Sequence, residues 1–232
     1  MRPRYSVSVI PPSRLPVRWP GDIREAREEQ EQLRSRVRIV PFSGMPPFVA
    51  GVDAAFSDAT VFAAACLYRL PELDCMEQAS AVLPLRFPYV PGYLSFREGP
   101  AIIAALERLN QRPDLLLLDG QGIAHPRGIG IASHLGVLLR IPTIGCAKTR
   151  LVGEHREPGK GKGAWAELRY EGRTVGAALR TRDAVRPVYV SPGHLIDLED
   201  SIRVVLGCIG RYRLPEPLRS ADRLSRERRR GG

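Results

Sequence analysis

Two aspartates in this chain each follow directly after a short apolar segment. Asp53 comes after residues 48–52 (FVAGV), and Asp119 comes after residues 115–118 (LLLL). An acid at the end of a buried strand is unfavourable unless it is paired or binds a cation. One such aspartate could equally cap a turn. Two on neighbouring central strands would supply the hard oxygen ligands that magnesium takes, often together with phosphate oxygens of a substrate.

Four further side chains could take part in the same chemistry. Glu98 stands early in a segment with helical spacing, where an acid also favours the helix dipole. His194 precedes the last expected helix; a lone loop histidine is usually solvated, but beside a metal site it could activate water. The same ambiguity applies to His125 and to Lys148, which stands at the end of an apolar strand.

The elements that must position these side chains alternate between strands and helices. Strands are predicted at residues 48–52, 60–68, 72–84, 114–118 and 142–147, with a hairpin at 164–170 and 174–181; helices are predicted from the N-cap Asp22 to about Val37 and at 96–110, 129–139 and 197–206. Three antiparallel strands followed by helix–strand–helix–strand predict an α/β fold with a mixed sheet. This is the element order of the ribonuclease H-like fold. In that fold the first and fourth strands are adjacent, which would bring Asp53 and Asp119 together.

The length of 232 residues fits one catalytic domain, which we place at residues 22–210. Residues 1–20 contain five prolines, so we expect an irregular N-terminal arm over residues 1–21. Residues 211–232 carry eight arginines against three acids, a balance of +5. We expect this basic tail to be disordered, with phosphate binding as a secondary role.

The charge and cysteine content narrow the function classes. A net charge of +10 and a pI of about 10.0 favour a polyanionic partner, although half of the excess lies in the tail. The four cysteines form no CxxC pair, so neither a zinc site nor a disulfide framework is expected. The sequence contains no apolar run of membrane-spanning length and no signal-peptide pattern, so the expected location is cytoplasmic.

Six segments of the chain, taken in order, closely resemble the endonuclease V family. They are residues 49–53 (VAGVD), 88–98 (PYVPGYLSFRE), 119–127 (DGQGIAHPR), 129–136 (IGIASHLG), 145–148 (GCAK) and 191–194 (SPGH). Any one of them would be weak evidence, but six in order at sensible spacing form a specific signal. The resemblance covers roughly residues 22 to 208.

This resemblance implies a ribonuclease H-like enzyme that cuts DNA at deoxyinosine, the deamination product of adenine. The family hydrolyses the second phosphodiester bond on the 3′ side of the lesion and leaves 3′-hydroxyl and 5′-phosphate ends. It implies Mg²⁺ as the cofactor, with Mn²⁺ expected to substitute. We expect a monomer that acts on DNA containing deoxyinosine.

The resemblance also assigns roles by position. Asp53 and Asp119 match the metal ligands, and Glu98 matches a further acid of the site. His194 matches the catalytic histidine. Lys148 lies where it would steady the scissile phosphate.

For base recognition, Tyr89 matches a wedge residue that contacts DNA beside the lesion. Pro88 and Pro91 restrict the backbone on both sides of Tyr89, and a stiff loop can push a ring into the base stack. Gly120 and Gly122 have no side chains, so the backbone there can approach a flipped base closely.

His125 and Leu94 are expected to help line this base pocket. Hypoxanthine differs from guanine by lacking the exocyclic 2-amino group. A tight pocket lined by backbone would therefore exclude guanine through steric conflict and an unpaired donor.

Two rival readings remain open at this stage. Inosine in RNA is an alternative substrate, because the catalytic parts would be shared. A non-catalytic protein that binds damaged or branched DNA is the second, although all three acids are present. A glycosylase is disfavoured, because that chemistry needs no acidic metal cluster.

Overall fold

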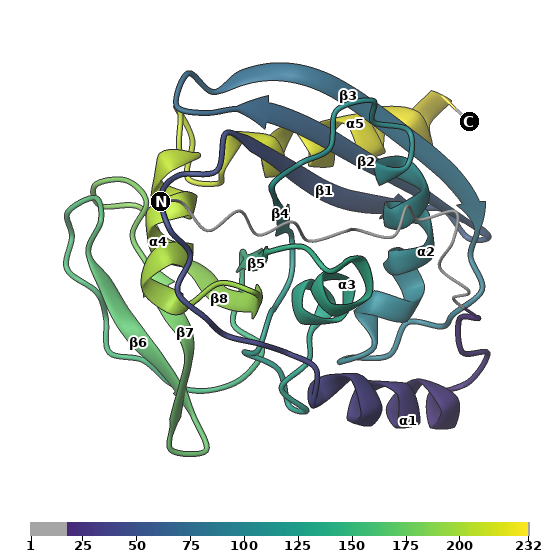
Figure 1. Ribbon diagram of the computed structural model, residues 1–232, viewed down its shortest axis with the longest axis horizontal. Coiled ribbons are helices and arrows are strands. Elements are labelled where there is room, and N and C mark those ends of the chain that lie inside the picture. The colour runs from purple at the N-terminus through teal and green to yellow at the C-terminus, as the bar shows by residue number, and fades with distance from the viewer. Residues whose placement is uncertain (1–17, 232) are drawn as a thin grey trace, which may run out of the picture.

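An eight-stranded mixed sheet forms the centre of the computed structural model, which describes residues 18–231 (Figure 1). The strand order across the sheet is β3-β2-β1-β4-β5-β8-β7-β6. The strands are β1 (Phe48–Phe56), β2 (Thr60–Arg69), β3 (Asp74–Pro84), β4 (Leu115–Leu118), β5 (Thr143–Ala147), β6 (Trp165–Tyr170), β7 (Arg173–Leu179) and β8 (Val188–His194). Residues 1–17 of the expected N-terminal arm lie outside the described part of the chain.

The centre of the sheet has the predicted arrangement. β1 pairs antiparallel with β2 and parallel with β4, and β4 pairs parallel with β5. All four residues of β4 are buried, because helices cover both faces of the sheet at this point. The α/β class and the ribonuclease H-like mixed sheet predicted from the sequence are therefore confirmed.

Five helices pack around this sheet, as Figure 1 shows. They are α1 (Ile23–Arg34), α2 (Leu94–Leu106), α3 (Ile131–Leu139), α4 (Leu198–Gly207) and α5 (Glu216–Gly231). α2 and α3 share one hydrophobic core with one face of β1, β2 and β4. α4 and the start of α5 share a second core with the opposite face. α1 begins where predicted, with the Asp22 carboxylate accepting a hydrogen bond from the backbone N–H of Glu25 at 2.8 Å.

The expectation of a disordered C-terminal tail is wrong. Residues 216–231 form α5, which lies across β1 and β2. Leu218 and Ala221 are buried against the sheet, and the Ser220 hydroxyl lies 2.6 Å from the Tyr68 hydroxyl of β2. The arginines that dominate the composition lie mainly on the outer face, so a short apolar stripe at helical spacing suffices to hold the helix.

A second difference concerns His194, which we treated as a loop histidine, and the residues before it. Residues 188–194 form β8, which pairs antiparallel with β5 and β7. Pro192 lacks an N–H, and the pairing with β5 shifts register beside it, between Thr143 and Ile144. The proline and glycine of this segment therefore mark an irregular strand.

No helix within residues 18–231 is both long and apolar enough to cross a membrane.

Gly51 decides how closely α5 approaches the sheet. A Cβ atom added at Gly51 would overlap the backbone of Pro217 and Leu218, the first turn of α5. Gly51→Ala should therefore push α5 outward and destabilise the protein, by about 1–3 kcal/mol for an overpacked site.

Urea unfolding followed by circular dichroism measures this change. Gly161→Ala is the matched control, because a Cβ at Gly161 would meet nothing within 4 Å. Equal stability of the two variants would contradict the tight contact between β1 and α5.

Candidate functional site

Asp53 and Asp119 lie side by side on neighbouring strands. Val52 of β1 is level with Leu118 of β4, and the two aspartates are the next residues along these parallel strands. β1 continues beyond this point to Phe56, paired only with β2. Asp53 therefore lies inside a strand, whereas Asp119 directly follows one. The predicted adjacency of the two acids is confirmed.

Two further carboxylates converge on this pair. Burial, followed by the charges of Asp119 and Asp222, raises the pKa of Asp53 to about 7. Glu98, which α2 buries, has a pKa well above its usual value because of burial and the charges of Asp53 and Asp119. Such mutual perturbation in one place marks a functional centre more often than a structural one.

Lys148 brings a positive charge to these acids from the end of β5. Its ammonium lies 2.5 Å from Oδ2 of Asp119 and 3.7 Å from Oδ1 of Asp222. Burial would lower the pKa of Lys148, but the neighbouring aspartates outweigh that effect and raise it. Lys148 is therefore charged and directed at the acids, as its predicted position requires.

Asp222 is the site residue that the sequence reasoning missed. It lies on α5, and Arg226 one turn later holds its carboxylate at 2.8 Å. The Ser225 hydroxyl of the same helix is 3.4 Å from Oδ2 of Asp53. We did not consider Asp222 because it lies in the segment that we expected to be disordered. The available signal was the helical spacing of Leu218 and Ala221, which predicts that α5 docks.

The chemistry of these donors fits a divalent cation. Four carboxylates supply hard oxygen ligands, and burial, followed by the charges of the neighbouring acids, raises the pKa values of Asp53 and Glu98. Within residues 18–231, no three acidic, histidine or cysteine side chains are already gathered closely enough to hold an ion. In this arrangement the Lys148 ammonium supplies the positive charge beside Asp119.

A cavity of about 340 Å³ opens directly beside the acids. Its lining includes most of the residues predicted for base recognition, together with two of the catalytic candidates: Tyr89, Pro91, Leu94, Gly120, His125, Asp119 and Lys148. Pro88 is exposed and does not line it. Gly122 lies elsewhere, against β8, where its N–H donates to the Ser191 hydroxyl at 2.7 Å and a Cβ would overlap Pro192. Gly122, which we expected to lie close to a flipped base, therefore does not line this cavity, and its missing side chain serves packing against β8.

The loop that carries Tyr89 is anchored from below. The carbonyl oxygen of Gly92 accepts hydrogen bonds from Gln30 Nε2 at 3.0 Å, from the His125 ring at 3.0 Å and from Arg127 at 2.7 Å. Tyr89 itself is 73% exposed at the rim of the cavity. The loop therefore holds an exposed aromatic ring on a fixed base.

His125 forms part of the cavity wall. Burial, followed by the charge of Arg127, lowers the pKa of His125 to about 4, so the ring is neutral at pH 7. One ring nitrogen donates to the Gly92 carbonyl, and the other accepts from the Arg127 N–H at 3.2 Å. Within the described chain, His125 therefore helps to hold the Tyr89 loop in place through the Gly92 carbonyl.

The structure does not bring His194, the predicted catalytic histidine, together with the acids. In the antiparallel pair of β5 and β8, Tyr189 is level with Ala147 beside the acids, whereas His194 is level with Thr143 at the far end. His194 is buried there, and its Nδ1 accepts a hydrogen bond from the Arg38 N–H at 3.2 Å. Burial, followed by the charge of Arg38, lowers the pKa of His194 to about 4.

Comparison with known proteins identifies the chain. The sequence pattern of the Endonuclease V family matches residues 31–223. An Endonuclease V from Roseiflexus sp. (strain RS-1) is 52% identical over 207 residues, which cover 89% of this chain and 93% of the relative. The chain belongs to the Endonuclease V family.

Solved structures of Endonuclease V agree with this assignment. The crystal structure of the enzyme from Streptomyces avermitilis superposes with a TM-score of 0.89 at 43% identity, covering 94% of this chain and 97% of that one. Endonuclease V from Ciona intestinalis, in complex with a 24mer DNA containing an inosine followed by a ribo-adenosine, gives a TM-score of 0.79 at 26% identity and covers 90% and 98%. The chain is therefore an endonuclease, and the non-catalytic binding protein considered above is not supported.

The Endonuclease V match extends further along the chain than the six resembling segments. It ends at residue 223 and so includes Asp222, which lies beyond the expected domain end at 210. The family's sequence pattern and the packing of α5 thus agree that the C-terminal helix is part of the enzyme.

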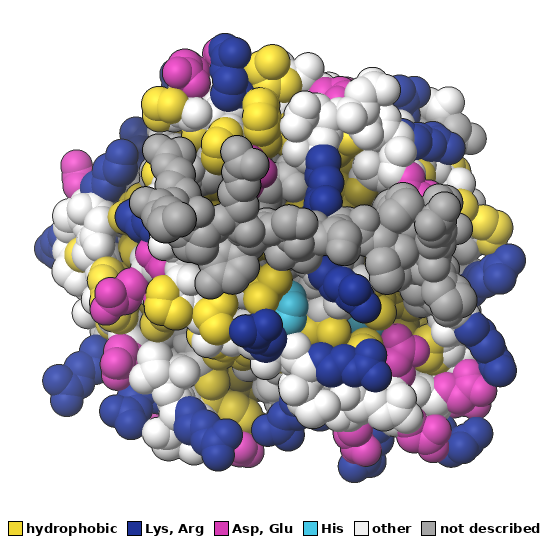
Figure 2. Space-filling view, viewed as in Figure 1, with side chains coloured by type: hydrophobic (Ala, Val, Ile, Leu, Met, Phe, Trp, Pro, Cys, Tyr) yellow, Lys and Arg dark blue, Asp and Glu magenta, His cyan; other side chains and the backbone are white. Residues whose placement is uncertain are grey.

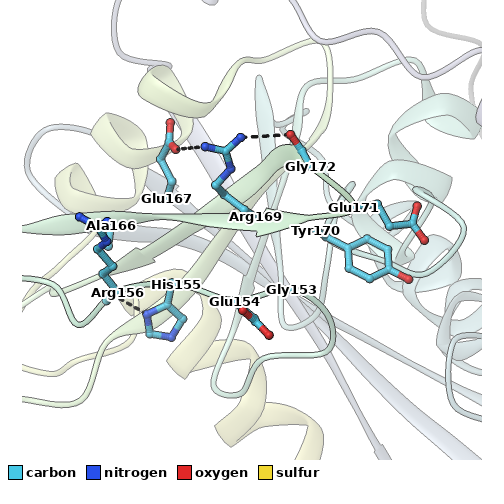
Figure 3. Close-up of a pocket in the computed structure, with 10 residues that line it drawn as sticks. All are labelled: Gly153, Glu154, His155, Arg156, Ala166, Glu167, Arg169, Tyr170, Glu171 and Gly172. Atoms are coloured by element: carbon cyan, nitrogen blue, oxygen red, sulfur yellow. Dashed lines mark hydrogen bonds and ion pairs between the residues drawn. The ribbon is translucent and has the colours of Figure 1, made fainter.

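A separate cavity of about 930 Å³ lies along the edge strand β6 (Figure 3). None of the predicted site residues lines it. Two of its charged side chains, the exposed Arg169 and Glu167, form an ion pair at 3.8 Å. This cavity has no connection to the carboxylates that would suggest catalysis.

Two substitutions test which residues belong to the site. Asp222→Asn should lower single-turnover cleavage by about 10²–10⁴-fold, the usual effect of losing a positioned acid–base or charged group. His194→Asn keeps an acceptor for the Arg38 N–H and should change the rate by less than about fivefold, well below that range.

The control is Arg226→Gln, which removes an ion-pair partner of Asp222 but leaves the Asp222 carboxylate in place. The cleavage rates of both variants are compared with the rate of this control. A severe loss in His194→Asn with full activity in Asp222→Asn would reverse the assignment.

Proposed function

We propose that this endonuclease recognises deoxyinosine in DNA and hydrolyses the second phosphodiester bond 3′ to the lesion. The products would carry 3′-hydroxyl and 5′-phosphate ends, and the reaction would depend on Mg²⁺. The observation that carries the proposal is that one cavity of base-holding size shares Asp119 and Lys148 with the carboxylate cluster. The Ciona relative, which binds inosine-containing DNA, supports the same substrate.

Asp53 and Asp119 would hold the magnesium ion, with Glu98 and Asp222 beside them, and manganese would substitute. When bound, such an ion offsets charge on the phosphate and makes a coordinated water more acidic. The four acids are already arranged so that extra positive charge would lower the raised pKa values of Asp53 and Glu98.

Lys148 and Asp222 would act on the phosphate and the water, respectively. The Lys148 ammonium is shared between Asp119 and Asp222, so it would turn to a phosphate oxygen with little movement. Lys148 and Arg226 orient the Asp222 carboxylate, and a carboxylate held in this way can accept a hydrogen bond from the attacking water.

The cavity beside the acids would receive the flipped base. Space at Gly120 is already tight, because a Cβ there would lie 2.6 Å from the Ile131 side chain. Leu94 and His125 also line this cavity. A close-fitting pocket would accept hypoxanthine and exclude guanine, whose 2-amino group needs both space and an acceptor.

Inosine in RNA is a second candidate substrate. In the Ciona complex the inosine is followed by a ribo-adenosine, so that relative accommodates a ribonucleotide on the 3′ side of the base. A panel of matched DNA and RNA strands with one inosine each would show which backbone this enzyme prefers.

The central experiment is cleavage of an end-labelled duplex with one deoxyinosine, with magnesium and with a chelator. Wild type should cut only with the metal, and mapping the product ends should place the cut at the second 3′ bond. Asp119→Asn should retain the fold and lose cleavage, because it removes a charged oxygen ligand. Near wild-type turnover of Asp119→Asn in magnesium would contradict the proposed metal site.

Tyr89 tests recognition apart from chemistry. If its ring fills the gap left by the extruded base, Tyr89→Ala should lose stacking of about 1–3 kcal/mol, or roughly fivefold to 150-fold in affinity for duplex. Single-stranded substrate needs no duplex opening, so its cleavage should suffer less.

Tyr89→Phe keeps the ring and is the matched control, which should behave nearly as wild type. Equal losses by Tyr89→Ala on duplex and single strand would mean that Tyr89 is an ordinary contact.

A further inference from the structure

Helix α1 carries a polar side chain in the middle of its buried face. Ala26, Gln30 and Leu33 are the buried residues of this helix, at the spacing that turns one face toward the rest of the protein. The outer face of α1 carries basic and acidic side chains together, at the lower right of Figure 2. Gln30 is only 1% exposed. Burial of an amide is unfavourable without hydrogen bonds, so the partners of Gln30 indicate its role.

The cavity that would receive the base lies between two segments that are distant in sequence. Residues within 89–95, the Tyr89 loop and the first turn of α2, line it on one side, and we call this segment the first wall. Residues within 125–131, just before and at the start of α3, line it as well, and we call this segment the second wall. Gln30 also lines the cavity, so α1 reaches it between the two walls.

The amide of Gln30 bonds to both walls. Its Nε2 donates to the Gly92 carbonyl of the first wall at 3.0 Å and, more weakly, to the Ile129 carbonyl of the second wall at 3.5 Å. Its Oε1 accepts from Nε of Arg127, also in the second wall, at 2.5 Å. Both ends of one buried amide therefore hold the two walls at a fixed separation.

Arg127 extends this link across the cavity base. Its Nη2 donates to the Gly92 carbonyl at 2.7 Å, and its guanidinium lies 4.2 Å from the centre of the Tyr93 ring. A planar guanidinium makes these contacts together only in one orientation. The bond from Arg127 Nε to Gln30 fixes that orientation, so Gln30 supports the one side chain of the second wall that reaches over to the first.

α1 is itself firmly placed, so Gln30 is a fixed support. Ala26 packs in a cluster with Phe87, Tyr93 and Phe96, which surround the first wall. Oε1 of Glu29 lies 3.1 Å from Nε2 of His134, a fully buried residue of α3. These contacts hold α1 against both α2 and α3.

We propose that Gln30 is a positioning residue that sets the width of the base cavity by tying its two walls together. This inference rests on the proposed function and deepens it. The limit on size that admits hypoxanthine and excludes the larger guanine would depend on the contact between α1 and the walls. Gln30 takes no part in the reaction at the acids.

The test compares two single-stranded DNAs that differ at one position, which is deoxyinosine or deoxyguanosine, and contain neither base elsewhere. Single-turnover rate and half-saturation in magnesium give the specificity for each strand. Gln30→Met keeps nearly the same volume but cannot bond to either wall. Its preference for deoxyinosine over deoxyguanosine should fall at least about tenfold, because fitting one small group in a close pocket is worth about 10-fold to 200-fold.

Gln32→Met is the matched control. It makes the same substitution two residues further along α1, at an exposed position that does not line the cavity, and it should keep the wild-type preference. The preference is a ratio of two specificities measured on one enzyme. A loss of folded protein lowers both equally, so a purely structural effect of Gln30→Met would leave the ratio unchanged.

An unchanged preference in Gln30→Met, whatever its overall rate, would overturn the inference and leave the proposed function standing. An equal fall in Gln32→Met would overturn it too. If wild type cut the deoxyinosine strand no better than the deoxyguanosine strand, the proposed function itself would fail.

Discussion

The repulsion among the carboxylates at the edge of β1 and β4 is the constraint around which the rest of the structure is organised. Asp53 and Asp119 follow level residues of adjacent parallel strands, so they cannot move apart. Burial and this proximity raise the pKa of Asp53 to about 7. A loosely held loop would relieve the repulsion by opening. The fully buried strand β4 prevents that, because displacing it would expose the apolar core on both faces.

The same constraint explains why the C-terminal helix is part of the enzyme. α5 brings Asp222 close to Asp53, which adds repulsion, and it can do so only because its own contacts hold it down. Leu218 and Ala221 provide those contacts, and the absence of a side chain at Gly51 lets the helix approach the sheet. A segment that reads as a charged tail therefore completes an acidic centre.

The features that depend on a local residue pattern could be predicted from the sequence. The apolar run of β4 and the acid that ends it identified Asp119, and strand order alone placed Asp53 beside it. The sequence could not predict placements that depend on long-range pairing. His194 lies at the far end of β8 because that strand runs antiparallel to β5, and no local feature reports that direction. Asp222 was hidden because the arginines of α5 outweigh its few buried side chains in composition.

The groups around the acids that are held rigidly would determine where a bound strand is cut. Three donors fix the Gly92 carbonyl beneath the Tyr89 loop, and β4 fixes Asp119, so Tyr89 and the acids are tied to one framework. Only long side chains such as Lys148 can adjust. If a base is held in the cavity beside Gly120, the backbone has a single fixed distance to cover before it meets the acids. The offset between lesion and cut would then be a property of this framework, so substitutions of individual site residues should change the rate of cutting without moving its position.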